Sequence, residues 1–109
     1  MNAQAAVTAL AALAQEHRLA LFRLLVQAGD EGMAAGRTAE RLGIPNSSLS
    51  FHLAQLNRAG LIRQERQHRS IIYRADYEAM NGLVGYLMEN CCGGDGSCVP
   101  ASATPACCG

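Results

Sequence analysis

The chain has 109 residues, half of them hydrophobic, so a single compact domain is expected. No apolar run approaches the roughly 20 residues of a membrane span, and the N-terminus lacks the basic start of a secretory signal. We therefore expect a cytoplasmic protein without a membrane partner, whose zero net charge at first argues against a nucleic-acid ligand.

The first part of the chain predicts two helices. Residues 3–15 are rich in alanine and carry larger apolar residues at helical spacing. Residues 16–28 form a second apolar stripe, and the glycines at 29 and 32 end that helix. The apolar positions are Val7, Leu10 and Leu13 in the first helix and Leu19, Phe22, Leu25 and Val26 in the second.

A tight helix-turn-helix is predicted next. A short helix over 34–42 closes on Gly43, a residue type that commonly follows a helix C-terminus, and 44–46 form a tight connection. Asn46 or Ser47 is expected to cap a helix that runs to about Ala59. The helical wheel of this second helix places Leu49, Leu53 and Leu56 together, facing the core.

After Gly60 the apolar pattern changes from helical to strand-like. Residues 61–66 and 70–74, joined by the polar turn 67–69, predict a β-hairpin. Residues 76–90 return to helix, with Asp76 capping its start and one apolar side made of Tyr77, Met80, Leu83, Val84 and Leu87. The order of elements over 1–92 predicts a mainly α protein with a small β-hairpin, a winged helix-turn-helix, and 93–109 are expected to form a flexible cysteine-containing tail.

The charge is unevenly distributed along the chain. Seven arginines and two acidic residues lie between Gly32 and Ala75, which gives that segment a charge of +5 and the two ends together −5. A basic middle between acidic ends indicates a localised anion-binding surface. A solvated surface in which arginines pair with acids is the alternative.

The exposed face of the 46–59 helix suits a DNA major groove. Its hydroxyl and amide side chains can reach base edges, and its aromatic ring can pack on a thymine methyl. The free N–H groups of its first turn can hold a phosphate, and the hairpin tip offers cations to phosphates or the minor groove. An ordinary amphipathic helix with a solvated hairpin would look similar. The predicted DNA contacts are Ser47, Ser48, Phe51, His52, Gln55, Arg58, Arg66, His68 and Arg69, with Ser48 and His52 at the flanks of the exposed face.

All five cysteines lie in the last nineteen residues. Cys91 and Cys92 are adjacent, and only a Gly-rich loop separates them from Cys98. Three soft thiolates without a nearby histidine suit a three-coordinate ion such as As(III) or Sb(III). Cys107 or Cys108 could supply a fourth sulfur for Zn(II) or Cd(II). A redox switch through disulfide formation is a further alternative. No motif indicates an organic cofactor.

Three stretches, residues 13–25, 39–53 and 56–62, resemble the ArsR-type (ArsR/SmtB) winged-helix regulators, and the resemblance extends over about residues 5–92. It implies a homodimer built from the first and last helices and an imperfectly palindromic operator. The arrangement of Cys91, Cys92 and Cys98 resembles a variant arsenic site at the end of the last helix. The Cys-x-Cys motif of many members is absent from 36–60, and the histidine of zinc-sensing members is absent from 77–90.

These observations predict a transcriptional repressor that binds double-stranded operator DNA and is released when As(III) or Sb(III) binds Cys91, Cys92 and Cys98. One alternative is a Cd/Zn- or redox-sensing repressor that uses the same cysteines. Another is a metal-buffering or delivery protein whose winged helix binds protein. An enzyme is not expected, because the sequence offers no acid–base pair, no nucleophilic triad and no phosphate-binding loop.

Overall fold

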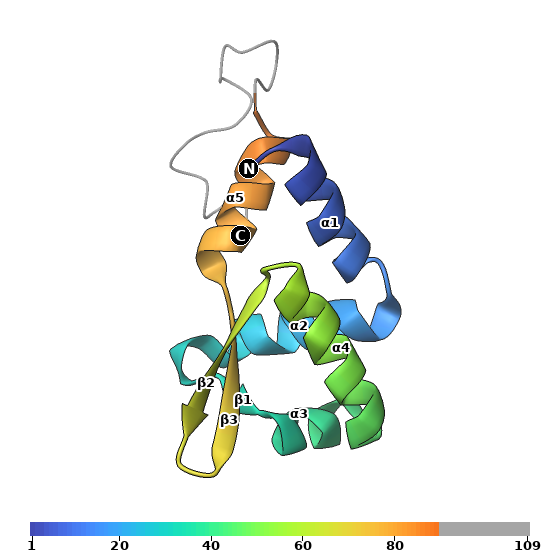
Figure 1. The fold of residues 1–109 in the computed structure, drawn as a ribbon, viewed down its shortest axis with the longest axis vertical. Coiled ribbons are helices and arrows are strands. Elements are labelled where there is room, and N and C mark those ends of the chain that lie inside the picture. Colours follow the sequence, from blue (N-terminus) through green and yellow to red (C-terminus); the bar gives the residue numbers. More distant parts are fainter. Residues whose placement is uncertain (90–109) are drawn as a thin grey trace.

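The computed structural model describes residues 1–89, which form helices around a small antiparallel sheet (Figure 1). The predicted tail and the predicted ligands Cys91, Cys92 and Cys98 lie outside these residues. The mainly α winged helix-turn-helix is confirmed. In chain order the elements are α1 (Ala3–Leu13), α2 (Glu16–Ala28), the 3₁₀ turn η1 (Gly29–Glu31), β1 (Met33–Ala34), α3 (Ala35–Leu42), α4 (Asn46–Arg58), β2 (Ile62–Gln67), β3 (Ser70–Ala75) and α5 (Tyr77–Leu87).

The predicted hairpin of β2 and β3 is extended by a strand that the sequence did not reveal. The sheet order is β1-β3-β2, all antiparallel, with Met33 opposite Tyr73. Gly32 makes this pairing possible, because its φ is +66° and a Cβ there would lie 2.7 Å from both the Ile72 Cγ2 and the Tyr73 carbonyl oxygen. Only glycine fits so close to β3 with a left-handed backbone.

Leucines from α2 and α4 fill the centre of the core. Leu21 and Leu25 of α2, Leu49 and Leu56 of α4, and Leu61 before β2 are fully buried. The inward face predicted for α4 is therefore confirmed. On α2 the predicted stripe holds for Phe22 and Leu25, whereas its first member Leu19 is exposed.

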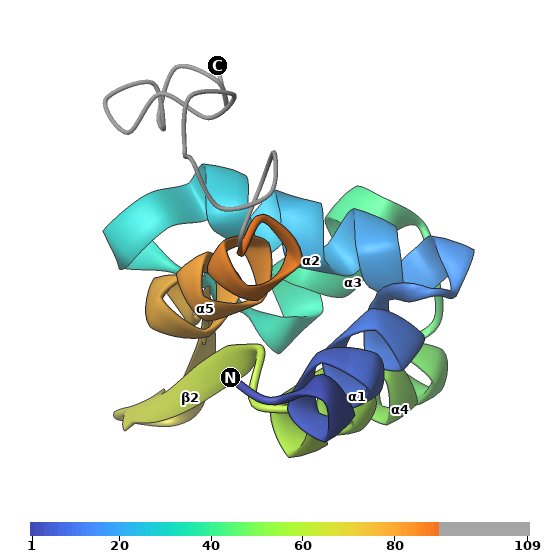
Figure 2. The same cartoon turned by 90° about the horizontal axis from the view of Figure 1, so that it is seen from above.

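The helices α1 and α5 lie side by side at one end of the fold (Figures 1 and 2). The residues that α1 buries are its small ones, Ala6, Ala9 and Ala12, which allow close packing on its neighbours. Several larger apolar side chains of the two helices, and Met88 directly after α5, are exposed, and we call them the apolar end: Val7, Leu10, Val84, Leu87 and Met88. Of the apolar side predicted for α5, only Leu83 is fully buried.

Two of the predicted helix ends are confirmed, and one predicted cap is wrong. Gly43 takes the left-handed conformation after α3, and Asp76 accepts a hydrogen bond of 3.0 Å from the Ala79 N–H at the start of α5, as predicted. The cap predicted from Asn46 or Ser47 is wrong. Pro45 occupies the N-cap position of α4 and no side chain caps this helix. No helix within residues 1–89 is long and apolar enough to cross a membrane.

Candidate nucleic-acid interface

The outer face of α4 carries an aromatic ring and small polar groups next to the helix-turn-helix connection. Ser47 and Ser48 are exposed in its first turn, and Phe51 is 57% exposed one turn further on. Because no side chain caps α4, the N–H groups of this first turn have no side-chain acceptor within residues 1–89. They therefore stay available to an anion at the positive end of the helix dipole.

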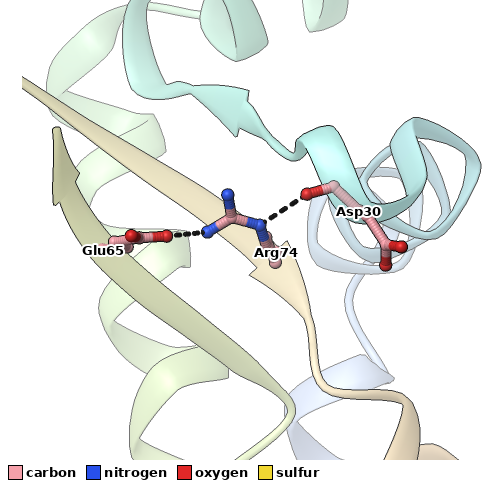
Figure 3. A network of polar contacts seen from close by, with 3 residues as sticks. All are labelled: Asp30, Glu65 and Arg74. Atoms are coloured by element: carbon pink, nitrogen blue, oxygen red, sulfur yellow. Dashed lines mark hydrogen bonds and ion pairs between the residues drawn. The ribbon is translucent and has the colours of Figure 1, made fainter.

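The hairpin carries several arginines and one acidic residue, Glu65, which is already paired with Arg74 (Figure 3). Arg74 of β3 forms an ion pair with Glu65 of β2 and also donates from Nε to the Asp30 carbonyl oxygen at 2.7 Å. This arginine is thus used inside the fold. Arg66 and Arg69 are exposed and form no ion pair with any residue from 1 to 89.

These contacts show how far arginine–acid pairing extends in the basic segment. Arginine–acid pairing accounts for Arg74, and only weakly for Arg63, whose Nε lies 4.0 Å from Asp76 Oδ2. The exposed arginines of α3, α4 and the hairpin tip have no such partner in the described part of the chain. A solvated surface of paired charges therefore explains only a part of the net charge of +5 between Gly32 and Ala75.

His52 is not on the exposed face of α4, and its predicted position at the flank is wrong. Its side chain is buried, and its ring packs against His17 of α2 with a centroid distance of 5.7 Å. The helical period explains this, because His52 lies three residues after Leu49 and four before Leu56, on the same side as both. It is a packing residue between α2 and α4.

The surroundings of His52 favour a neutral ring. Burial lowers its pKa first, and the nearby positive groups His17 and Arg18 lower it further. Its Nδ1 has no hydrogen-bond partner among the described residues. Burial of a nitrogen without a hydrogen-bond partner costs less free energy when the ring carries no charge.

The other predicted contacts divide between two surfaces. Gln55 is half-buried and turned toward α1, where it and Arg58 line a hollow. Sequence reasoning missed Arg18, which α2 brings to the same hollow. No local signal marks this residue, because the contact joins positions far apart in the sequence. The predicted contacts that are exposed are Ser47, Ser48, Phe51, Arg58, Arg66, His68 and Arg69.

The described residues contain no metal centre. No three His, Cys, Asp or Glu side chains within residues 1–89 lie close enough to share an ion. Asp76 caps α5.

A helix-turn-helix followed by an antiparallel wing, with an exposed polar recognition helix and a basic wing tip, defines a winged-helix protein of the kind that regulates transcription. A family model for a helix-turn-helix domain matches residues 13–65. The transcriptional activator HlyU of Vibrio cholerae is 30% identical over 91 residues, 84% of this chain and 82% of HlyU. The transcriptional regulator YgaV of Escherichia coli is 31% identical over 91 residues, 84% of this chain and 90% of YgaV.

Solved structures agree with these relatives. An ArsR-like transcriptional regulator from Rhodococcus sp. RHA1 superposes with a TM-score of 0.71 at 27% identity, over 79% of this chain and 78% of that one. A possible transcriptional regulator for arsenical resistance gives a TM-score of 0.61 at 26% identity, over 70% of this chain and 76% of that one. The chain belongs to the ArsR-type family of winged-helix transcriptional regulators.

Proposed function

We propose that the protein is a homodimeric repressor that binds operator DNA through α4 and the wing, and that As(III) or Sb(III) releases it by binding Cys91, Cys92 and Cys98. The observation that carries the DNA-binding part is the uncapped first turn of α4, with Ser47, Ser48 and Phe51 exposed around it. A DNA phosphate would accept from the free N–H groups, and the side chains would then reach base edges. Arg66 and Arg69 would hold the backbone or the minor groove at the wing tip.

The apolar end supports the homodimer. Val7 of α1 is 64% exposed, and Val84 and Leu87 of α5 are each more than half exposed. Their burial against a second copy would remove apolar surface from water at about 25 cal/mol per Å². A two-fold interface made from α1 and α5 would also fix the distance between the two α4 helices, as a palindromic operator requires.

The cysteines support a thiophilic inducer. Cys91 and Cys92 follow the last residue of α5, Leu87, after a few positions, and five residues separate Cys92 from Cys98. As(III) arrives as a neutral trihydroxide, so three thiols can replace three hydroxides as three waters leave, with no net charge left behind. One of the solved structures above is itself described as a possible regulator for arsenical resistance. An ion bound beside α5 would act on the proposed dimer interface, and through it on the operator, with a coupling of about 1–3 kcal/mol.

The test is operator release. The reduced protein is titrated onto a fluorescent duplex from its own promoter, and sodium arsenite is then added while anisotropy is followed. We expect arsenite to weaken operator binding by about 5- to 150-fold, the range that such a coupling gives. Cys91→Ser, Cys92→Ser and Cys98→Ser should each bind the duplex and fail to respond, because a hydroxyl is a poor ligand for a soft ion.

Cys107→Ser and Cys108→Ser are the matched controls and should respond as the wild type does. Loss of the response in either would favour a four-sulfur Zn(II) or Cd(II) site, and release by a thiol oxidant alone would favour a redox switch. X-ray absorption on the arsenite complex should count three sulfur neighbours.

A promoter reporter tests the direction of regulation: its output should rise with arsenite, whereas a fall would indicate an activator, the role given to HlyU.

A further inference from the structure

A hollow of about 450 Å³ lies between three helices, open to solvent on one side. Its walls come from the second half of α1, the first turn of α2 and the last turn of α4. Its volume falls in the range of about 300–1,000 Å³ typical of small-molecule sites.

One wall of the hollow is positively charged. Arg18 and Arg58 both line it, with Gln55 and Thr8 as neutral hydrogen-bonding neighbours. Within residues 1–89, no acidic residue lines it and neither arginine forms an ion pair.

Arg18 is also held in place. It is half-buried, and its Nε donates to the Ala12 carbonyl oxygen at 2.7 Å. That bond uses one of the five guanidinium N–H groups and leaves those on the terminal nitrogens for a further acceptor. A fixed guanidinium suits a carboxylate, because it presents parallel donors at little extra cost in side-chain entropy.

The rest of the lining is apolar. Val7 and Ala11 of α1 and Ala59 at the end of α4 belong to it. A phosphate of a DNA backbone would gain nothing from these groups, whereas a small organic anion would place its hydrocarbon body against them. The charged and apolar parts of the lining together match a ligand with one carboxylate and a compact apolar body.

We propose that this hollow binds a small organic carboxylate, held by Arg18 and Arg58 against the apolar wall of α1. The ligand contacts α1 on one side and α4 on the other, so its binding links the helix that carries half of the apolar end to the recognition helix. This site is separate from the proposed cysteine site. Its existence does not depend on an arsenic response.

The probe is benzoate, with benzamide as its neutral analogue and inorganic phosphate as an anion without an apolar body. Each is titrated into the full ¹⁵N-labelled chain at constant ionic strength, and backbone amide shifts are followed. Benzoate should give saturable shifts at Ala11, Arg18 and Ala59. Benzamide and phosphate should each bind about tenfold more weakly or worse, because each lacks one of the two matched groups.

Arg18→Gln should weaken benzoate binding by about tenfold, and Arg58→Gln by a similar factor. Arg23→Gln, at an exposed position of α2 that does not line the hollow, should leave it unchanged. Equal binding of benzamide or phosphate, shifts located elsewhere, or full affinity in both hollow variants would each overturn the proposal. None of these readouts uses DNA or arsenite, so failure here is distinguishable from failure of the proposed repressor function.

Discussion

The two ends of this fold contribute different kinds of side chain to its core. At the end formed by α3, α4 and the sheet, large side chains such as Leu49 and Leu56 point inward and are fully buried within one chain. At the end formed by α1 and α5, small alanines point inward, and larger residues such as Val7 and Leu87 point to solvent. The first end buries its large apolar side chains within one chain, whereas the second exposes apolar surface that a partner chain would cover. Damage to the first should therefore be independent of protein concentration, and damage to the second should not.

The largest effect is expected from Leu56→Ala. This side chain is fully buried on the inner face of α4, so its truncation should cost about 2–5 kcal/mol in the free energy of unfolding. Urea denaturation at two protein concentrations measures the loss. Phe51→Ala, on the outer face of the same helix, is the control and should change stability by no more than about 0.5 kcal/mol. Equal losses in both variants would contradict the assignment of the two faces.

Gly32→Ala should come next. The added Cβ would lie 2.7 Å from two atoms of β3 and would also need a left-handed backbone, so we expect a loss of about 2–4 kcal/mol. Gly29→Ala separates these causes, because Gly29 has a similar φ of +68° with no atom near the added Cβ. Its loss should be only about 1 kcal/mol. Thermal unfolding of the two variants side by side tests the pairing of β1 with β3.

Leu87→Asp probes the other end. A charge at this half-exposed position should leave the isolated chain folded and weaken the proposed dimer by roughly 30- to 100-fold, about 2–3 kcal/mol. Sedimentation velocity over a concentration series measures the dimer, and circular dichroism checks the fold. Leu19→Asp, at an exposed leucine of α2 outside the apolar end, should leave the dimer intact. The prediction fails if both variants dissociate equally, or neither does.

The smallest effect is a pH dependence from His52. Its pKa in the folded chain is lowered, mainly by burial, below the usual value near 6.5, so the unfolded chain takes up a proton more readily. The contribution of His52 to stability should be complete above about pH 6.5 and should decrease as the pH falls from there toward the lowered pKa. Urea midpoints measured between pH 7.5 and about pH 5 should show this slope in the wild type and in His68→Gln, and a reduced slope in His52→Gln.

Local periodicity was sufficient to predict much of the fold. The inward leucines of α4, the helix over 16–28 and the two hairpin strands follow from repeats of 3.6 and two residues, which are visible in sequence. The caps at Gly43 and Asp76 were predictable because they depend on neighbouring residues only. The order of these helices and strands was then enough to predict the winged helix-turn-helix.

Other features depend on contacts between distant segments. The strand β1 has two residues, too few for any periodicity, and it exists because β3 pairs with it. The contact of His52 with His17 and the place of Gln55 in the hollow depend on how α1 and α2 pack on α4. Most of the predicted DNA contacts are exposed as expected, and the cysteine site stays a prediction because its residues lie outside the described range.

The most direct test of the account is the stoichiometry and salt dependence of operator binding. Fluorescence anisotropy of a duplex from the promoter, at a duplex concentration well above the dissociation constant, should saturate at two chains per site. The logarithm of affinity should fall linearly with the logarithm of salt concentration, and Arg69→Ala should reduce that slope by about two, one for each protomer of the bound dimer. Phe51→Ala should instead reduce the preference for the promoter over a shuffled duplex. Saturation at one chain per duplex, or no preference for the promoter in the wild type, would contradict the account.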